Sequence, residues 1–146
     1  MKNTNINTNI GEIWNANIDG IDYLVTITST KFRDLKELDE CIRVVPVLRE
    51  GCYSLSDLCL ETDMLIEHHS GTLLLEWWNE RPMQVKHLTH RVGQLDAHQL
   101  RALKFSMQNP SLPESLSARE FRDLEIGRKK AISDSVFEDL FELLAE

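Results

Sequence analysis

The most constraining feature of this chain is a pair of short stretches, residues 12–18 and 23–29, that are rich in Ile, Val, Thr and aromatic residues and flank Asp19-Gly20. Residues of these types favour extended backbone, and Asp-Gly adopts the left-handed conformations of a type I′ turn with little strain. Strands joined by so short a turn pair antiparallel. The sequence therefore predicts a tight β-hairpin near the N-terminus.

Further apolar runs indicate that the β-rich pattern continues beyond this hairpin. We expect strands at residues 41–48, 63–68, 72–78 and 83–87. Pro46 indicates an edge strand or a bulge in the first of these, because proline has no N–H for the ladder. Ser70-Gly71 is the predicted turn of a second hairpin. Its second arm, 72–78, is almost continuously apolar, so we expect it to be covered on both faces or to lie in a subunit interface.

Two segments in this part of the chain have a helical pattern instead. Thr30 can cap a short helix over residues 31–40, in which apolar residues recur at helical spacing at Phe32, Leu35 and Leu38. A second helix is predicted over residues 95–108, with Asp96 as its N-cap and Gln99 completing a capping box. Together with the strands, these helices predict a small α+β domain of barrel-like architecture.

The chain divides at residues 109–113, where two prolines interrupt the periodic apolar pattern. We expect a flexible Asn-rich tail, a β-rich domain, and a helical extension packed on that domain, at residues 1–9, 10–109 and 110–146. In the extension, Ser117 and Glu120 have the spacing of a capping box, and Gly127 is the expected end of that helix.

The segment that begins at Asp134 is acidic on one face and apolar on the other. It carries five acidic residues and no basic one, and its apolar face includes Phe137, Leu140, Phe141 and Leu144. A helix of this kind can lie in a hydrophobic groove of a partner. The alternative is an ordinary helix that closes the core of its own domain.

Composition limits the classes of function. The chain has 146 residues, of which 42% are hydrophobic and 27% charged, which suits one globular domain. The formal net charge of −8 argues against broad phosphate binding, because that needs clustered Lys and Arg. No stretch has the length and apolar character of a membrane span or a signal peptide, so we expect a cytosolic protein.

The residue types that most often bind metals are not arranged as ligands here. Cys41, Cys52 and Cys59 have no CxxC spacing, and we expect all three to be reduced and buried as small apolar residues. His87 and His90 lie three positions apart, without an HExxH pattern. The sequence therefore predicts neither a metal nor a cofactor.

Four short segments resemble one known family in the same order along the chain. Gly11-Glu12-Ile13-Trp14 resembles the first strand of the MazF and PemK toxins, and Leu24-Val25-Thr26-Ile27-Thr28-Ser29 resembles the second. Ile42-Arg43-Val44-Val45-Pro46-Val47 is similar to the strand that follows. Arg91-Val92-Gly93-Gln94-Leu95, with the helix after it, is similar to the closing helix of that family. The resemblance covers about residues 10–109 and leaves the C-terminal extension outside it.

The resemblance implies an SH3-like barrel that forms symmetric dimers and, in active members, cuts single-stranded RNA without a metal. Two positions depart from the family pattern. Active members carry Gly-x-x-Arg-Pro between the first two strands, whereas this chain has only Asp19-Gly20-Ile21-Asp22. Active members place Thr and Ser after the Val-Pro-Val strand, whereas this chain has Leu48-Arg49-Glu50-Gly51. Both catalytic contributions of the family are therefore missing from their expected places.

Three other residues are candidates for the lost chemistry. Metal-free RNA cleavage needs a base, an acid and a cation on the phosphate. Arg49, Glu50 and Arg81 could supply such groups. Arg81-Pro82 repeats the family's Arg-Pro pair, but at the end of a different hairpin. The alternative for both arginines is a solvated or interface-pairing role.

The aromatic pair Trp77-Trp78 is either part of the core or an exposed anchor in a partner groove. With the acidic final segment, it favours a non-catalytic protein-interaction module that forms a homodimer or binds another protein. A diverged endoribonuclease acting on single-stranded RNA is the alternative. The sequence leaves enzymatic activity undecided, and the missing residues favour its absence.

Overall fold

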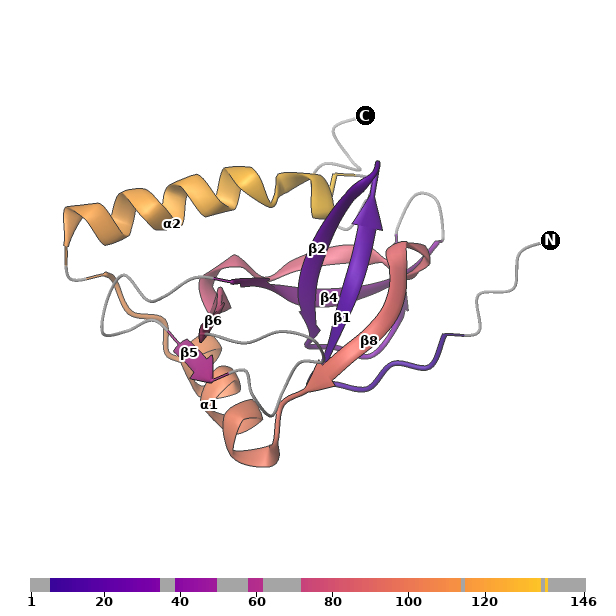
Figure 1. The fold of residues 1–146 in the computed structure, drawn as a ribbon, viewed down its shortest axis with the longest axis horizontal. Helices are drawn as coiled ribbons and strands as arrows, with labels where there is room; N and C mark the ends of the chain where they lie inside the picture. Colours follow the sequence, from indigo (N-terminus) through magenta and orange to yellow (C-terminus); the bar gives the residue numbers. More distant parts are fainter. Residues whose placement is uncertain are drawn as a thin grey trace.

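The computed structural model describes residues 6–34, 39–49, 58–61, 72–113, 115–134 and 136. Its strands are β1 (Glu12–Ile18), β2 (Ile21–Ile27), β3 (Phe32–Arg33), β4 (Glu40–Leu48), β5 (Leu58–Glu61), β6 (Thr72–Leu75), β7 (Arg81–Gln84) and β8 (Leu88–Gln94). They form one antiparallel sheet in the order β5-β6-β4-β2-β1-β8, while β3 and β7 also pair with β4. The sheet curls into a half-barrel accompanied by two helices (Figure 1). The predicted α+β fold is confirmed.

The hairpin predicted around Asp19-Gly20 is confirmed. β1 and β2 pair antiparallel over six residue pairs. Asp19 and Gly20 both have positive φ, 53° and 86°, as a type I′ turn requires. The Gly20 N–H donates to Asn17 Oδ1 at 3.2 Å, which adds a local hydrogen bond to the turn.

The central strand of the sheet is β4, so the expectation of an edge strand or a bulge at Pro46 is wrong. Its pairing with β2 is continuous, and Pro46 lies opposite Val25. On its other side β4 pairs with β7 as far as Val44 and with β6 from Val47 onward. Pro46 lies between these two ladders, so its missing N–H removes no bond from either. Its carbonyl accepts a hydrogen bond from the Glu76 N–H at 2.9 Å.

The helix expected over residues 31–40 is wrong for the part of that segment that the structure describes. β3 is a strand, and both of its residues pair with the start of β4. A short helix by itself is marginal, whereas a strand beside β4 gains ladder bonds and cross-strand contacts. Residues 35–38 lie outside the described residues.

The prediction that residues 72–78 form an apolar strand covered on both faces is confirmed in part. In β6, Leu73, Leu74 and Leu75 are all 0% exposed, so both faces of the strand are covered. Its neighbours are β4 on one side and β5 on the other. The strand is shorter than expected, and Trp77–Asn79 form a 3-10 turn, η1. The expected first arm, 63–68, lies outside the described residues.

The strand expected at residues 83–87 is displaced in the structure. β7 ends at Gln84, Val85–His87 form a second 3-10 turn, η2, and β8 follows at once. Sequence reasoning missed β8, because three of its successive residues, Thr89, His90 and Arg91, are exposed and polar and show no alternation. β8 pairs with β1 and closes that end of the strand order.

The first helix, α1 (Ala97–Gln108), begins as predicted. Asp96 accepts a hydrogen bond from the Gln99 N–H at 2.8 Å, and Gln99 Oε1 accepts one from the Asp96 N–H at 2.9 Å. This reciprocal capping box satisfies two backbone donors that a helix start leaves unpaired. Leu103 of this helix is 0% exposed and belongs to the hydrophobic core.

The second helix, α2 (Leu116–Arg128), starts earlier than predicted. Ser115 rather than Ser117 is the N-cap, because the Ser115 hydroxyl accepts a hydrogen bond from the Ala118 N–H at 3.1 Å. The helix continues through Gly127 and is followed by a 3-10 turn, η3 (Lys130–Ile132). α2 runs along one flank of the sheet (Figure 1). In the described part of the chain, no helix is long and apolar enough to cross a membrane.

Two hydrophobic clusters lie on opposite faces of the sheet. Neighbouring residues of one strand, such as Ile13 and Trp14, belong to different clusters, as the alternation of a strand requires. The first cluster includes Leu103 of α1, and the second includes Ile132 of η3. Trp14 is 9% exposed and donates from Nε1 to Glu12 Oε1 at 3.0 Å. The helical extension therefore contributes to the core.

The cysteines differ from one another. Cys41 is buried, as expected, and its thiol donates to the Asp39 carbonyl at 3.4 Å. Cys59 in β5 is disulfide-bonded, so the expectation that all three cysteines are reduced is wrong. A disulfide depends on how closely two chain segments approach, which the lack of a CxxC spacing does not exclude.

Replacing Gly11 by alanine is expected to destabilise the fold by about 1–2 kcal/mol, because an L-residue is strained at positive φ. Gly11 has φ +99°, and an added Cβ would lie 3.4 Å from Leu100 Cδ2 of α1. Urea denaturation measures the change. Gly127→Ala is the matched control: its site lies inside α2 with no atom within 4 Å of an added Cβ, so stability should stay equal or rise. Equal effects of the two variants would contradict the prediction.

Candidate functional site

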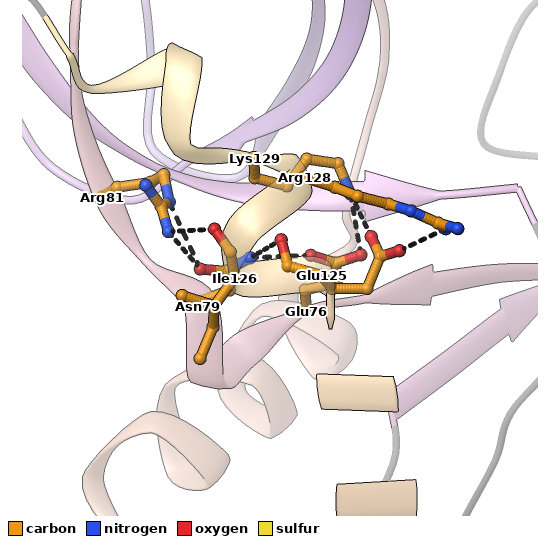
Figure 2. Close-up of polar contacts among 7 residues, drawn as sticks. All are labelled: Glu76, Asn79, Arg81, Glu125, Ile126, Arg128 and Lys129. Carbon is orange, nitrogen blue, oxygen red and sulfur yellow. Dashed lines mark hydrogen bonds and ion pairs between the residues drawn. The ribbon is translucent and has the colours of Figure 1, made fainter. Parts of the chain in front are cut away.

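The candidate catalytic residue Arg81 is half-buried and donates four hydrogen bonds to other groups of the chain. Its Nε and Nη2 donate to Asn79 Oδ1 at 3.2 and 2.9 Å. Nη1 donates to Ser133 Oγ at 2.9 Å, and Nη2 also donates to the Ile126 carbonyl at 3.0 Å (Figure 2). Burial lowers the pKa of Arg81 from its usual value, although a guanidinium keeps its charge in proteins. Arg81 therefore connects β7 to the end of α2.

A buried ion cluster lies beside Arg81 and consists of Glu76, Glu125 and Lys129. Lys129 Nζ is 2.9 Å from Glu76 Oε2 and 2.5 Å from Glu125 Oε1 (Figure 2). Both carboxylates are 0% exposed, and the lysine side chain is 9% exposed. Glu76 follows β6, whereas the other two residues belong to the end of α2. The cluster therefore links the sheet to the helical extension.

Two further residues complete the polar contacts of this cluster. Asn79 Nδ2 donates to Glu76 Oε1 at 3.0 Å and to the Glu125 carbonyl at 3.2 Å. Arg128 Nη1 is 2.9 Å from Glu125 Oε2, and its side chain is 56% exposed. The carboxylates thus have partners on both oxygens, which a buried charge requires.

Burial raises the pKa of Glu76 to about 7, and a hydrogen bond with Glu125 acts in the same direction. Lys129 and Asn79 oppose this rise. Burial also raises the pKa of Glu125, but hydrogen bonds with Glu76, Lys129 and Arg128 outweigh it and hold that pKa below its ordinary value. Of the two carboxyls, Glu76 is therefore the one that keeps its proton to the higher pH.

The two tryptophans lie against α2 of the same chain. Trp77 is 4% exposed, and its ring meets that of Trp78 edge to face with centroids 5.9 Å apart. The guanidinium of Arg122 lies 5.0 Å from the Trp77 centroid and 4.7 Å from the Trp78 centroid. The Phe121 ring meets the Trp78 ring edge to face, with centroids 6.3 Å apart. A cation over two aromatic faces contributes to the docking of α2.

Arg49 lies in a different place, at the rim of a cleft between the sheet and the end of α2. This α2 cleft has a volume of about 490 Å³. Its apolar lining comes from β2 and β4, namely Ile21, Tyr23, Leu24, Val47 and Leu48. Its charged lining comes from Asp22, Arg49, Glu125, Arg128 and Lys129. Hydrogen bonds from Asn17 and Asn15, with a smaller effect of the Arg49 charge, lower the pKa of Asp22.

The structure does not bring the predicted catalytic residues together. Arg49 lines the α2 cleft, whereas Arg81 does not. Glu50 lies outside the described residues, as do Phe137, Leu140, Phe141 and Leu144. Within the described ranges, no three His, Cys, Asp or Glu side chains form a group that could hold a metal ion.

Sequence reasoning missed the buried ion cluster, although two signals for it are present. Glu76 is the lone charged residue between Leu73-Leu74-Leu75 and Trp77-Trp78, and a charge within such a run needs a partner. Glu125 and Lys129 have the i, i+4 spacing of an ion pair on a helix. No local pattern predicts that these two segments meet, because they are separated by about fifty positions in the sequence.

The described geometry defines an α+β protein with a curled antiparallel sheet and a helix docked on it through buried charges. No protein-family profile matches the chain, and no curated protein matches its sequence. Among solved structures it is similar to the Mycobacterium tuberculosis toxin MazF-mt6, with a TM-score of 0.48 and 17% identity over 67% of this chain and 93% of that one. It is also similar to a second M. tuberculosis toxin, with a TM-score of 0.43 and 14% identity over 66% and 99% of the two chains. MazF is the family that the sequence resembles, and the similarities concern the fold alone.

Proposed function

We propose that this chain is a non-catalytic protein-interaction module built on a toxin-like sheet, with its acidic C-terminal segment covering that sheet or a partner subunit. The observation that supports this most is the engagement of Arg81. All three of its guanidinium nitrogens donate to groups of this chain, so the Arg-Pro pair of β7 has a structural role. A cation that stabilises a phosphate must be free to meet it.

Charge is the second support for this proposal. The net charge of −8 repels a polyanion, and the candidate Arg81 already has partners within the chain. Arg49 is the remaining candidate, and it faces the carboxylate of Asp22 rather than an acid and base pair. Such a surface suits a protein partner better than an RNA substrate. A homodimer is the partner arrangement that we expect.

The purified protein is expected to leave a mixed single-stranded RNA pool intact. Arg49→Ala should leave both RNA and stability unchanged, whereas Arg81→Ala should lower the free energy of unfolding by about 2 kcal/mol, because several charge-assisted hydrogen bonds are lost. Gel analysis of the RNA and urea denaturation give the two readouts. Arg101→Ala, at an exposed position on α1, is the matched control.

RNA cleavage that either Arg49→Ala or Arg81→Ala abolishes would overturn the proposal in favour of a diverged endoribonuclease. The expected self-association is measured on the same samples by sedimentation, independently of the RNA readout. A strictly monomeric protein that binds no protein partner would remove the interaction role.

A further inference from the structure

The α2 cleft combines an apolar interior with guanidinium groups at its rim. Its volume of about 490 Å³ is in the range of binding clefts in proteins. Leu24 and Val47 are buried, while Ile21 remains 57% exposed at its edge. Arg49 stands on the sheet side and Arg128 on the helix side. A ligand that fits these walls has an apolar side chain close to a carboxylate.

The chain itself contains a segment of this chemistry. Residues 137–146 include four acidic and no basic residues, together with Phe137, Leu140, Phe141, Leu143 and Leu144. This composition complements the cleft in both respects, since the acidic groups match its two arginines and the aromatic and leucine side chains match its interior. Without the four acidic residues of this segment, the rest of the chain still has a formal net charge of −4, so basic groups that can attract the segment are in the minority.

The position of this segment along the chain also favours the cleft. Lys129 lines the cleft, and Val136, the last described residue, follows it by seven positions. The ten residues after Val136 can span about 33 Å when extended. The end of α2 lies beside the sheet where β2 begins, at the opposite side of the molecule from α1 (Figure 1). The segment therefore starts close to the cleft and far from α1.

We propose that residues 137–146 bind in the α2 cleft of their own chain, with apolar side chains against Leu24 and Val47 and carboxylates on Arg49 and Arg128. This inference rests on the proposed function and names the surface that the segment covers. Arg128 already pairs with Glu125, but a guanidinium has five N–H donors and can hold a second carboxylate.

Hydrogen exchange of the full-length protein tests this inference. Backbone amides of residues 137–146 are expected to be protected, and Arg49→Glu should accelerate their exchange by about tenfold. Changing Glu138, Asp139, Glu142 and Glu146 to Lys, with Arg49 left in place, should accelerate the exchange in the same way, which a merely structural effect of the Arg49 substitution would not predict. Arg101→Glu with Lys104→Glu on α1 is the matched control and should change nothing.

Three outcomes would overturn the inference. The first is exchange of residues 137–146 at the rate of an unprotected peptide in the wild-type protein. The second is an equal effect of the α1 control variant. The third is protection that increases with protein concentration, which would assign the cleft to the segment of a second copy. Because the RNA assay and sedimentation are separate readouts, failure of this inference is distinguishable from failure of the proposed function.

Discussion

Lys129→Met is expected to lower the free energy of unfolding by about 3 kcal/mol at pH 8, because removing one partner of a buried ion pair leaves an uncompensated charge. Lys129 is the cation that lies between the two fully buried carboxylates Glu76 and Glu125. Methionine keeps the length and most of the apolar volume of lysine, so the change isolates the loss of charge. Urea denaturation monitored by circular dichroism measures the difference.

Lys130→Met is the control for this prediction, since Lys130 is the next residue and is exposed. Its effect should lie within about 0.5 kcal/mol of zero. Replacing Glu76 and Lys129 together by leucine should cost less than Lys129→Met alone, because no unpaired charge remains at Glu76. If the two single lysine variants were equally stable, the cluster would not hold α2 on the sheet.

The second large effect is a pH dependence that comes from Glu76. Its pKa is raised from 4.5 to about 7, so the folded state keeps a proton that the unfolded state releases. The stability from this group is fully present below about pH 4.5 and is lost as the pH rises through about 7. From pH 5 to pH 8, the wild-type protein should lose on the order of 2 kcal/mol relative to Glu76→Gln, which cannot titrate.

Several charged or polar groups face Glu76 and also affect how stability depends on pH. They are Lys129 and Glu125 from the end of α2, Asn79 from η1 and, by its charge, Arg81 from β7. The lowered pKa of Glu125 contributes the opposite trend, with stability lost as the pH falls, so only the difference from Glu76→Gln isolates the wanted group. Glu120→Gln, at an exposed site on α2, serves as the control. Parallel pH profiles for wild type and Glu76→Gln would contradict the prediction.

The elements that sequence predicts correctly are those whose signals are local. Asp19-Gly20 determines its turn by backbone preference, and the Asp96 and Gln99 pair determines the start of α1 through two short-range hydrogen bonds. The central β6 follows from an apolar run that only a buried strand or helix can carry.

The errors arise where a distant segment decides the local structure. β3 adopts a strand because β4 is beside it, although its own spacing favours a helix. Pro46 is tolerated in a central strand because the neighbour of β4 changes from β7 to β6 at that point. β8 is polar on its exposed positions and is held by its pairing with β1. None of these partners can be read from a window of ten residues.

The candidate site depends even more on segments that are distant in the sequence. Arg81 belongs to an Arg-Pro pair that is visible in the sequence, yet its partners Ser133 and Ile126 come from the C-terminal extension. Arg49 directly follows the strand with Val-Pro-Val, but the cleft beside it exists only because α2 returns to the sheet. The residue types of a site are visible in sequence, whereas the surfaces that enclose them depend on the fold.

The aromatic contacts of α2 give this protein an internal optical reporter. It has three tryptophans, and two of them, Trp77 and Trp78, lie under the guanidinium of Arg122, whereas Trp14 belongs to β1 and to the second core cluster. Detachment of α2 would expose the first two indoles to water and shift their emission to the red, while Trp14 would keep its environment. Intrinsic fluorescence would thus change in two stages if the helical extension leaves before the sheet unfolds, and in one stage if the two parts are a single cooperative unit.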